Sequence, residues 1–382
     1  MKNNRRDFIT KGASLAAAVS IGGITAGIAR RPALQENESS LDVDVADLAK
    51  DAGMQASEAY FSGMNERKVA LLKQMEVFGA VGGINTEMVS LKDAKPWDLN
   101  AVSTVKKAWS NVGLNFNVVE GPPSLGEKTK LGLEGRDEEI ANFITFMQNL
   151  SKTGVDTVCY NWMPVIGWYR TKHDHIGRGG ALVTAFDYED IKNAPLTEYG
   201  EVSKETMWKT LEYFLKAVVP EAEKVGMKLA MHPDDPQVDN MKGISRIMTT
   251  VDNFKKLVDL VPSPSNGITL CQGNFSLMGA DIPTVAQYFG KRKLIHFVHF
   301  RNVRGGKFKF EETFHDEGQI DMYKAMEAYY NSGFRGPIRP DHVPTMAGDS
   351  NEFPGYSTIG SLFAWGYIKG LMEAVSKSKN KA

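Results

Sequence analysis

The chain is poor in cysteine and carries no excess of charge of either sign. Its 45 basic and 46 acidic residues give a formal net charge of -1, and the two signs are interleaved along the sequence. A protein that binds nucleic acid needs a basic surface, so we exclude that class. The 382 residues are 42% hydrophobic and 24% charged. This is an ordinary globular composition, with enough apolar mass for one large core or two smaller ones.

Long apolar runs are also missing, which matters most at the N-terminus. Arg5 and Arg6 precede a mildly apolar stretch, residues 12–29, that contains four glycines. The pattern predicts a twin-arginine export signal over residues 1–29. A short membrane anchor is the alternative, but the glycines and weak hydrophobicity disfavour a stable span. We therefore expect the twin-arginine export machinery as a partner and the periplasm as the destination.

Residues 30–52 are polar and include Pro32 and two glutamates, a composition that predicts a linker. From residue 53 onward the pattern changes to a regular alternation of short apolar strands and amphipathic helices. We predict strands at 54–59, 80–84, 114–119, 155–160, 227–232, 267–271, 294–300 and 336–340. Helical periodicity occupies the segments between and after them, at 66–75, 100–112, 137–152, 203–225, 251–260, 281–289, 321–331 and 357–375.

Eight strand–helix units in one continuous segment predict a closed (β/α)8 TIM barrel, an α/β fold. A doubly wound sheet would usually stop at five or six strands. Residues 53–382 are therefore expected to form a single domain. The two cysteines, Cys159 and Cys271, could form a disulfide in an exported protein, but the barrel places them two strands apart, which disfavours that bond.

One connection in this pattern is much longer than the others. Residues 162–199 separate the fourth strand from its helix and include the glycine pair Gly179 and Gly180. Long connections without regular structure are typical of lids and binding surfaces. A plain surface excursion, or a contact in a homo-oligomer, is the alternative.

Good metal ligands end four consecutive predicted strands. These residues are His232, Cys271, His299 and Asp341. A lone histidine at a strand end is more often a structural group, but parallel strands of a barrel bring four such ends to one rim. A thiolate, two imidazoles and a carboxylate suit Mn, Fe, Co or Zn better than Mg or Ca. His296 has the opposite strand parity to His299 and should point away from the barrel interior.

Residues beside these ligands could carry proton transfer and substrate binding. His342 follows Asp341 directly and is the best general acid or base, because an imidazole titrates near neutral pH. Support of Asp341 is its alternative role. Four residues at the same rim could contact a substrate, with packing roles as the alternative: Asn161, Arg170, Arg301 and Asn302.

Several of these segments resemble the mannonate dehydratase family. The matching stretches are V-C-Y-N-W-M-P-V from Val158, M-H-P-D-D-P from Met231, N-G-I-T-L-C-Q-G from Asn266, I-H-F-V-H-F-R-N-V from Ile295, F-E-E-T-F-H-D-E-G-Q-I-D-M-Y from Phe310 and G-P-I-R-P-D-H from Gly336. The resemblance implies a xylose-isomerase-like barrel that dehydrates D-mannonate to 2-keto-3-deoxy-D-gluconate with a divalent ion, commonly Mn2+. It also implies a metal shell of His232, Cys271, His299 and Asp341.

The same resemblance implies that His342 and Tyr356 act as acid and base. The chain departs from the family pattern around 57–61, where an Arg-Trp pair is usual, and at Val343 and Pro344. These changes remove expected substrate contacts and leave the metal ligands in place. Two other functions therefore stay open. One is isomerisation or epimerisation of a sugar or sugar acid on the same barrel, and the other is binding of a sugar acid without catalysis.

Overall fold

The computed structural model describes residues 52–379 of the chain. The predicted signal at 1–29 and nearly all of the predicted linker at 30–52 lie outside the described residues. Among the described residues, no helix has both the length and the apolar character that crossing a membrane would demand.

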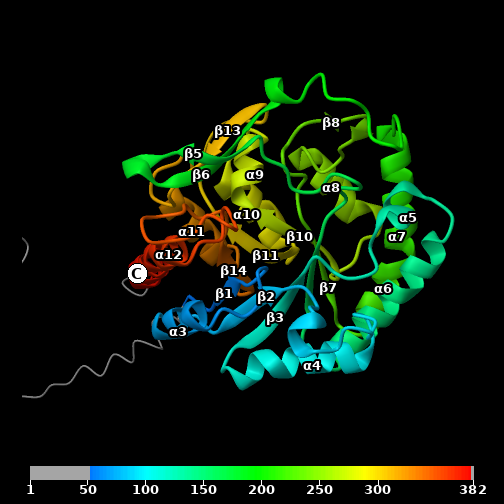
Figure 1. The fold of residues 1–382 in the computed structure, drawn as a ribbon, viewed down its shortest axis with the longest axis horizontal. Helices are drawn as coiled ribbons and strands as arrows, with labels where there is room; N and C mark the ends of the chain where they lie inside the picture. Colours follow the sequence, from blue (N-terminus) through cyan, green and yellow to red (C-terminus); the bar gives the residue numbers. More distant parts are fainter. Residues whose placement is uncertain (1–51, 380–382) are drawn as a thin grey trace, which may run out of the picture. The chain divides into compact units, whose positions relative to one another are not determined.

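Eight parallel strands close into a barrel, as the alternation of elements predicts (Figure 1). In chain order they are β1 (Gln55–Ala59), β2 (Gly79–Gly82), β3 (Asn115–Glu120), β4 (Thr157–Tyr160), β7 (Lys228–Met231), β10 (Asn266–Cys271), β11 (Ile295–Phe300) and β14 (Pro337–Pro340). Each strand pairs with its neighbour in that order, and β1 pairs with β14 to complete the ring. The TIM-barrel prediction is confirmed, with strand boundaries within two residues of those expected.

Helices connect successive barrel strands and cover the outside of the ring (Figure 1). They are α3 (Glu66–Gln74), α4 (Leu99–Asn111), α5 (Glu127–Leu131), α6 (Arg136–Ser151), α7 (Lys204–Lys224), α8 (Val251–Leu260), α9 (Gln272–Leu277), α10 (Ile282–Lys291), α11 (Met322–Asn331) and α12 (Thr358–Lys379). Capping residues explain several starts: the side chains of Asn65, Ser203 and Thr250 each accept a hydrogen bond from a backbone N–H in the first turn.

Every second residue of a barrel strand points into the ring, and these side chains fill the barrel interior. Val81, Val118, Cys159, Ala230 and Phe297 form a separate buried cluster inside the ring. The larger core lies outside it, between the strands and the helices. Because Phe297 faces inward, residue 299 on the same strand faces inward too.

Both cysteines are free thiols, as the barrel geometry predicts. His296 has the outward parity, and its closest neighbours include Gly267 and the Lys228 and Asp156 charges rather than the inward-facing side chains. The prediction that His296 points away from the interior is therefore confirmed.

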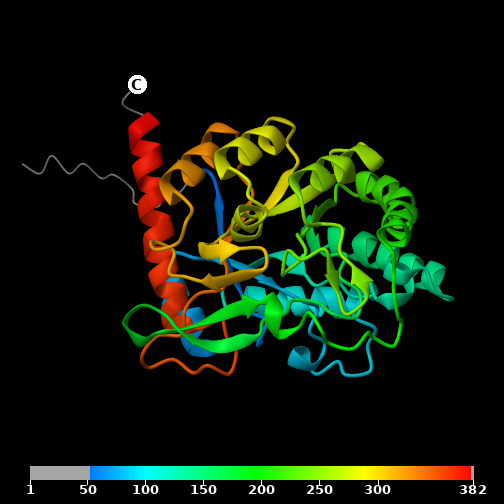
Figure 2. The ribbon, with the colours of Figure 1, turned by 90° about the horizontal axis from the view of Figure 1, so that it is seen from above.

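The long connection at 162–199 is not irregular, which corrects the sequence-based prediction. It contains β5 (Lys172–Ile176) and β6 (Leu182–Asp187), which pair with each other. Together with the hairpin β12 (Val303–Gly306) and β13 (Lys309–Glu312) they form an antiparallel sheet in the order β12-β13-β6-β5 (Figure 2). We call this four-stranded sheet the rim sheet. Three strands of the rim sheet contribute to a separate buried hydrophobic cluster. Phe186 comes from β6, Val303 from β12 and Phe310 from β13.

Candidate functional site

A cavity of about 130 Å³ lies where the barrel strands end. Its lining comes from residues at or just beyond the carboxyl ends of β3, β4, β7 and β14, and from the connections that follow them. Among the lining residues are Glu120, Asn161, His232, Asp341, His342 and Tyr356. Parallel barrel strands place their carboxyl ends on one face, which is where this fold holds its active sites.

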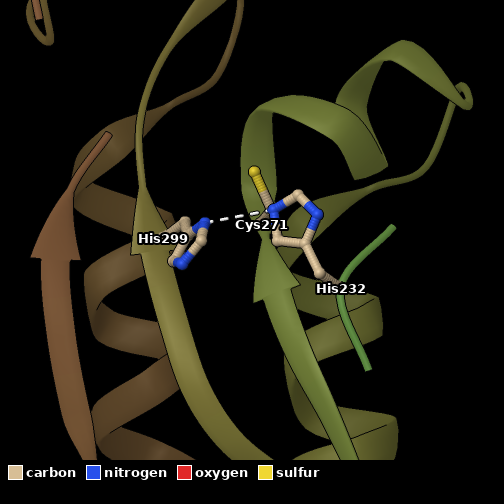
Figure 3. A group of neighbouring side chains, drawn as sticks. All are labelled: His232, Cys271 and His299. Atoms are coloured by element: carbon tan, nitrogen blue, oxygen red, sulfur yellow. Dashed lines mark hydrogen bonds between the residues drawn. The ribbon is translucent and has the colours of Figure 1, made fainter. Parts of the chain in front are cut away.

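The four predicted metal ligands lie close together, and two of them, His232 and Asp341, line this cavity. His232 Nε2 lies 3.2 Å from His299 Nδ1, and His299 Nδ1 lies 3.6 Å from Asp341 Oδ2. Asp341 Oδ2 is in turn 3.6 Å from Cys271 Sγ. One ligand atom from each of His232, Cys271 and His299 lies within 4.8 Å of the other two. Figure 3 shows these three side chains reaching toward one another from neighbouring strand ends.

These separations fit a shared divalent ion. Two donors that bind one ion at about 2.1 Å, at an angle of about 90–110°, lie about 3.0–3.4 Å apart. The imidazole nitrogens and the nearest carboxylate oxygen have spacings close to this range. The residues present therefore fit a metal ion, and the mixed nitrogen, sulfur and oxygen set favours a transition metal.

Burial and neighbouring charges shift the pKa values of these proposed ligands. Burial, together with the neighbouring His299, lowers the pKa of His232 to about 4. Burial also raises the pKa of the Cys271 thiol well above its ordinary value. For Asp341, burial alone would raise the pKa, but the electrostatic influence of the neighbouring His342 and Arg339 side chains outweighs burial and holds the pKa well below its ordinary value. A bound cation would favour a neutral imidazole and a thiolate, so metal binding would release protons.

A second carboxylate supports the cluster from the opposite wall of the barrel. Glu120 Oε2, at the end of β3, lies 3.5 Å from His299 Nε2. Arg339 bonds both oxygens of Glu120, at 3.2 and 3.0 Å, and donates to Asp341 Oδ1 at 2.8 Å. Burial would raise the pKa of Glu120, but the Arg339 guanidinium and His299 lower it to about 2.

His342 stands in a strained backbone conformation next to Asp341. Its φ angle is +48°, a left-handed value that side chains other than glycine adopt rarely and often at functional sites. Its Nδ1 contacts Glu312 Oε1 at 3.1 Å and Arg301 Nη1 at 2.5 Å. Its Nε2 lies 3.7 Å from Asp341 Oδ1. The Nε2 atom of His342 therefore lies on the side of the proposed metal ligands, and its Nδ1 atom contacts Glu312 and Arg301 on the other side of the ring.

Tyr356 completes the acid–base pair that the sequence resemblance implies. Its ring lies 5.7 Å from the His342 ring, edge to face, and 5.1 Å from Phe61. Burial and the nearby Asp341 charge raise the pKa of the phenol well above its ordinary value. The hydroxyl is therefore protonated at neutral pH, as an acid would need to be.

The four predicted substrate contacts divide into two groups. Asn161 lines the cavity, and its Oδ1 accepts from Lys130 Nζ at 3.1 Å, which leaves the amide N–H groups for a ligand. The side chains of Arg170 and Arg301 are fully buried and paired with Asp235, at 2.5 and 3.2 Å. Neither arginine lines the cavity, and both pair with Asp235, which does.

Asn302 is used entirely within the fold. Its Nδ2 donates to the carbonyls of His315 and Ile320, and its Oδ1 accepts from the backbone N–H of Val303 and Ile320. No group of its side chain is left to bind a substrate. These bonds therefore disfavour the sequence-based prediction that Asn302 contacts a substrate. The carboxyl end of β11 turns directly into the hairpin of β12 and β13, and the Asn302 side chain bonds to the backbone around that turn.

Sequence reasoning missed four charged residues that surround the ligands. They are Glu120, Asp235, Glu312 and Arg339, each buried or nearly so. Glu120 directly follows the predicted strand 114–119, as Asp341 follows 336–340, so the same strand-end rule could have found it. Glu312 lies on the rim sheet, which the sequence did not reveal.

The model of the D-mannonate dehydratase family matches this chain over residues 54–198 and 188–382. A mannonate dehydratase from Streptococcus uberis is 34% identical over 348 residues, which cover 84% of this chain and 99% of that protein. Mannonate dehydratase 2 from Halalkalibacterium halodurans is 32% identical over 351 residues, covering 85% of this chain and 100% of the relative.

Solved structures give the same picture. The crystal structure of mannonate dehydratase from Streptococcus suis serotype 2 superposes with a TM-score of 0.76 at 31% identity, covering 86% of this chain and 95% of that one. A xylose isomerase domain protein from Planctomyces limnophilus superposes with a TM-score of 0.53 at 10% identity, covering 85% and 98%. The second likeness shows the fold alone, a barrel shared with that xylose isomerase domain protein.

Proposed function

Because the chain belongs to the mannonate dehydratase family, we propose that it dehydrates D-mannonate to 2-keto-3-deoxy-D-gluconate. The observation that carries the proposal is a single arrangement at the barrel mouth. The proposed ligands come from four consecutive barrel strands and lie close together, and two of them, His232 and Asp341, line one cavity with His342 and Tyr356. A hydro-lyase acting on a sugar acid needs those two components, an electrophile and an acid–base pair.

We propose that His232, Cys271, His299 and Asp341 hold a divalent ion, with Mn2+ expected and Fe2+, Co2+ or Zn2+ as the other options. When bound, such an ion supplies positive charge that stabilises the negative charge developing on the substrate carboxylate. The ligand spacings described above support this assignment. The mixed donor set also disfavours Mg2+ and Ca2+, which prefer oxygen.

The side chains of this chain would move two protons. A base removes the proton from the carbon beside the carboxylate, and the electron pair forms a double bond to the next carbon. The hydroxyl on that next carbon leaves with a proton from an acid. His342 Nε2 and the Tyr356 hydroxyl are the groups we assign to these transfers. The enol that remains converts to the 2-keto acid without further help.

The arginine network orients this machinery. Glu312 and Arg301 hold Nδ1 of His342, so the imidazole ring has one orientation toward the substrate. Arg170 pairs with both Asp235 and Glu312, at 2.5 and 2.7 Å. We propose a direct substrate contact for Asn161, which lines the cavity, and a supporting role for Arg170 and Arg301.

The test begins with metal-free protein reloaded separately with Mn2+, Fe2+, Co2+ and Zn2+. Each form is incubated with D-mannonate and other aldonates, and a 2-keto-3-deoxy acid is measured. We expect product with D-mannonate and an ion requirement. Recovery of an isomeric acid would instead indicate an epimerase or isomerase, and no product from any aldonate would overturn the proposal.

Two variants separate catalysis from binding. His342→Gln and Tyr356→Phe should lower kcat by about 10²- to 10⁴-fold, the usual contribution of a general acid or base. Metal content measured by atomic spectroscopy should stay at the wild-type level in both. A sugar-acid-binding protein without catalysis would show no turnover in the wild type and unchanged ligand affinity in the variants.

We further propose that the protein acts in the periplasm after twin-arginine export. The support is the Arg5-Arg6 pair and the weakly apolar segment that follows. Replacing both residues, Arg5→Lys and Arg6→Lys, should leave the protein in the cytoplasmic fraction, whereas Lys2→Arg should not change its location. Equal distribution of wild type and the double variant after fractionation would contradict this proposal.

A further inference from the structure

A second and larger cavity adjoins the first. Its volume is about 420 Å³, against about 130 Å³ for the cavity that holds the proposed acid–base pair. The two cavities share Glu120 and Gly121 as lining residues. The larger one lies at the carboxyl ends of β1, β2 and β3, on the side of the barrel away from Cys271 and His299. The proposed reaction uses none of its other lining residues.

Aromatic rings and glycines line this second cavity. Tyr60 follows β1 directly, Trp109 comes from α4, and their ring centroids lie 5.0 Å apart. Gly82 and Gly83 contribute bare backbone at the end of β2. Small-molecule sites typically combine a volume of this size, apolar and aromatic walls and a few polar groups.

Two hydrogen-bond donors on these rings have no partner. Tyr60 is 4% exposed and Trp109 is 2% exposed. Neither the Tyr60 hydroxyl nor the Trp109 indole N–H has a hydrogen-bond partner within residues 52–379. Burial and the nearby Glu58 raise the pKa of Tyr60, so its hydroxyl keeps its proton. Buried Tyr and Trp donors are normally paired, and acceptor atoms of a ligand beside these two rings would satisfy donors that the described residues leave unpaired.

The charge of the cavity narrows the class of ligand. Glu120 is the only charged residue among those that line it in the described part of the chain, and no lysine or arginine does so. A phosphate or a second carboxylate would therefore lack a counter-charge. A neutral polyhydroxyl group fits, because its ring faces are apolar enough to lie on aromatic side chains and its oxygens accept hydrogen bonds.

We propose that this second cavity binds a hexopyranosyl unit attached to the sugar acid, so that the preferred substrate is a glycosylated aldonate. The acid portion would occupy the cavity with His342 and Tyr356, and the glycosyl portion would extend past Glu120 and Gly121. The inference rests on the proposed function for the chemistry, and adds the substrate class. The reaction at the acid portion is unchanged, since the carbon atoms that lose the proton and the hydroxyl carry no glycosyl group.

The test compares two acids on the full-length protein loaded with Mn2+. One is D-mannonate and the other is 4-O-β-D-mannopyranosyl-D-mannonate. Titration calorimetry measures the Kd of each, and the 2-keto-3-deoxy assay measures kcat/KM. We expect the glycosylated acid to bind at least tenfold more tightly and to have the higher kcat/KM. Equal or weaker binding of the glycosylated acid would overturn the inference.

Gly83→Leu is the blocking variant. A Cβ built at Gly83 meets nothing nearer than 3.9 Å, and this glycine has no positive φ, so the side chain can enter the cavity without backbone strain. The variant should erase the tenfold preference and leave the Kd of D-mannonate within twofold of wild type. Gly366→Leu is the matched control, because Gly366 is exposed on α12 and has open space around it. An unchanged preference in Gly83→Leu would overturn the inference.

Tyr60→Phe tests the unpaired donor with a smaller change. It removes one hydroxyl and keeps the ring, and should raise the KM of the glycosylated acid about fivefold while kcat stays unchanged. If the KM of the glycosylated acid does not change, or if the donor binds only water, the assignment of that donor fails.

The outcomes also separate this inference from the proposed function. Should D-mannonate react and the glycosylated acid bind no better, the substrate class is wrong and the dehydratase proposal stands. Should neither acid react while the glycosylated acid still binds tenfold more tightly, the cavity assignment stands and the dehydratase fails.

Discussion

Glu120 and Arg339 tie the proposed metal ligands to both walls of the barrel. Arg339 bonds Glu120 on one side and Asp341 on the other, and Glu120 faces His299 Nε2 at 3.5 Å. A carboxylate behind a metal-bound histidine fixes which ring nitrogen carries the proton and raises the basicity of the other. With Glu120 on the Nε2 side, the nitrogen of His299 that would face the proposed ion is Nδ1.

Glu120→Gln should lower the affinity for Mn2+ by about 10- to 100-fold, the usual cost of losing such a support. Titration of metal-free protein with Mn2+, followed by electron paramagnetic resonance of the free ion, measures this without any turnover. Glu201→Gln is the matched control, because Glu201 is exposed. Unchanged affinity in Glu120→Gln would show that His299 needs no support from Glu120.

At the level of residues, the sequence predicted which proposed ligands would lie close together, but it did not predict the residues around them. His232, Cys271, His299 and Asp341 each end an apolar strand, and a barrel brings strand ends together. The roles of Arg170 and Arg301 could not be read in the same way. Their partners, Asp235 and Glu312, come from other connections, and only the folded chain shows that these charges neutralise one another.

The rim sheet is joined to the barrel by buried charges. Arg170 precedes β5, Glu312 ends β13, and Asp235 follows β7, and the three side chains are at most 1% exposed. Each charge in this group has lost its water and depends on its partners. The rim sheet and the barrel wall therefore hold each other in place next to His342.

Arg170→Met should lower the free energy of unfolding by about 3 kcal/mol, because it leaves the buried Asp235 and Glu312 with one arginine, Arg301, where the fold provides two. Denaturant titration at neutral pH measures the loss. On the same sheet, Arg304 pairs with Glu311 and Glu317, and its side chain is 50% exposed. Arg304→Met should therefore cost at most about 1 kcal/mol. Similar losses in the two variants would contradict the distinction.

Barrel strands and helices were predictable because each carries its own apolar pattern. The rim sheet could not be predicted, because its strands carry no clear apolar pattern of their own. The sequence of β5 is K-H-D-H-I and that of β13 is K-F-E-E, too polar and too short for a period of two to stand out. The pairing of β6 with β13 joins residues more than a hundred positions apart, which no local pattern contains.

Over the whole molecule, several buried histidines are held neutral. Burial is the main cause that lowers the pKa of His232, His296 and His315 to about 4. In an unfolded chain the same groups titrate near 6.5. Between these two values the unfolded chain binds protons that the folded chain does not, so stability falls as the pH falls.

We expect the metal-free protein to lose up to about 4 kcal/mol of stability per pH unit between roughly pH 6 and 4, about 1.4 for each of three histidines. Denaturant titrations at pH 7, 6 and 5 with a chelator present measure the slope. His296→Gln, which lies away from the metal ligands, should reduce the slope by about 1.4 kcal/mol per pH unit. A slope of zero from pH 7 to 5 would refute the prediction. Four buried carboxyl groups at the site, Glu120, Asp235, Glu312 and Asp341, have lowered pKa values, so the stability that they contribute is lost only as the pH falls below about 4.5.

The pairing of β1 with β14 has a consequence for biosynthesis. Asp341 and His342 follow the last strand of the ring, so a nascent chain still on the ribosome has neither a closed barrel nor a full set of donors. The four proposed donors are together only after β14 has been made and has paired with β1. Affinity alone ranks the proposed ions poorly, so we expect the ion pool of the compartment in which the ring closes to select the metal.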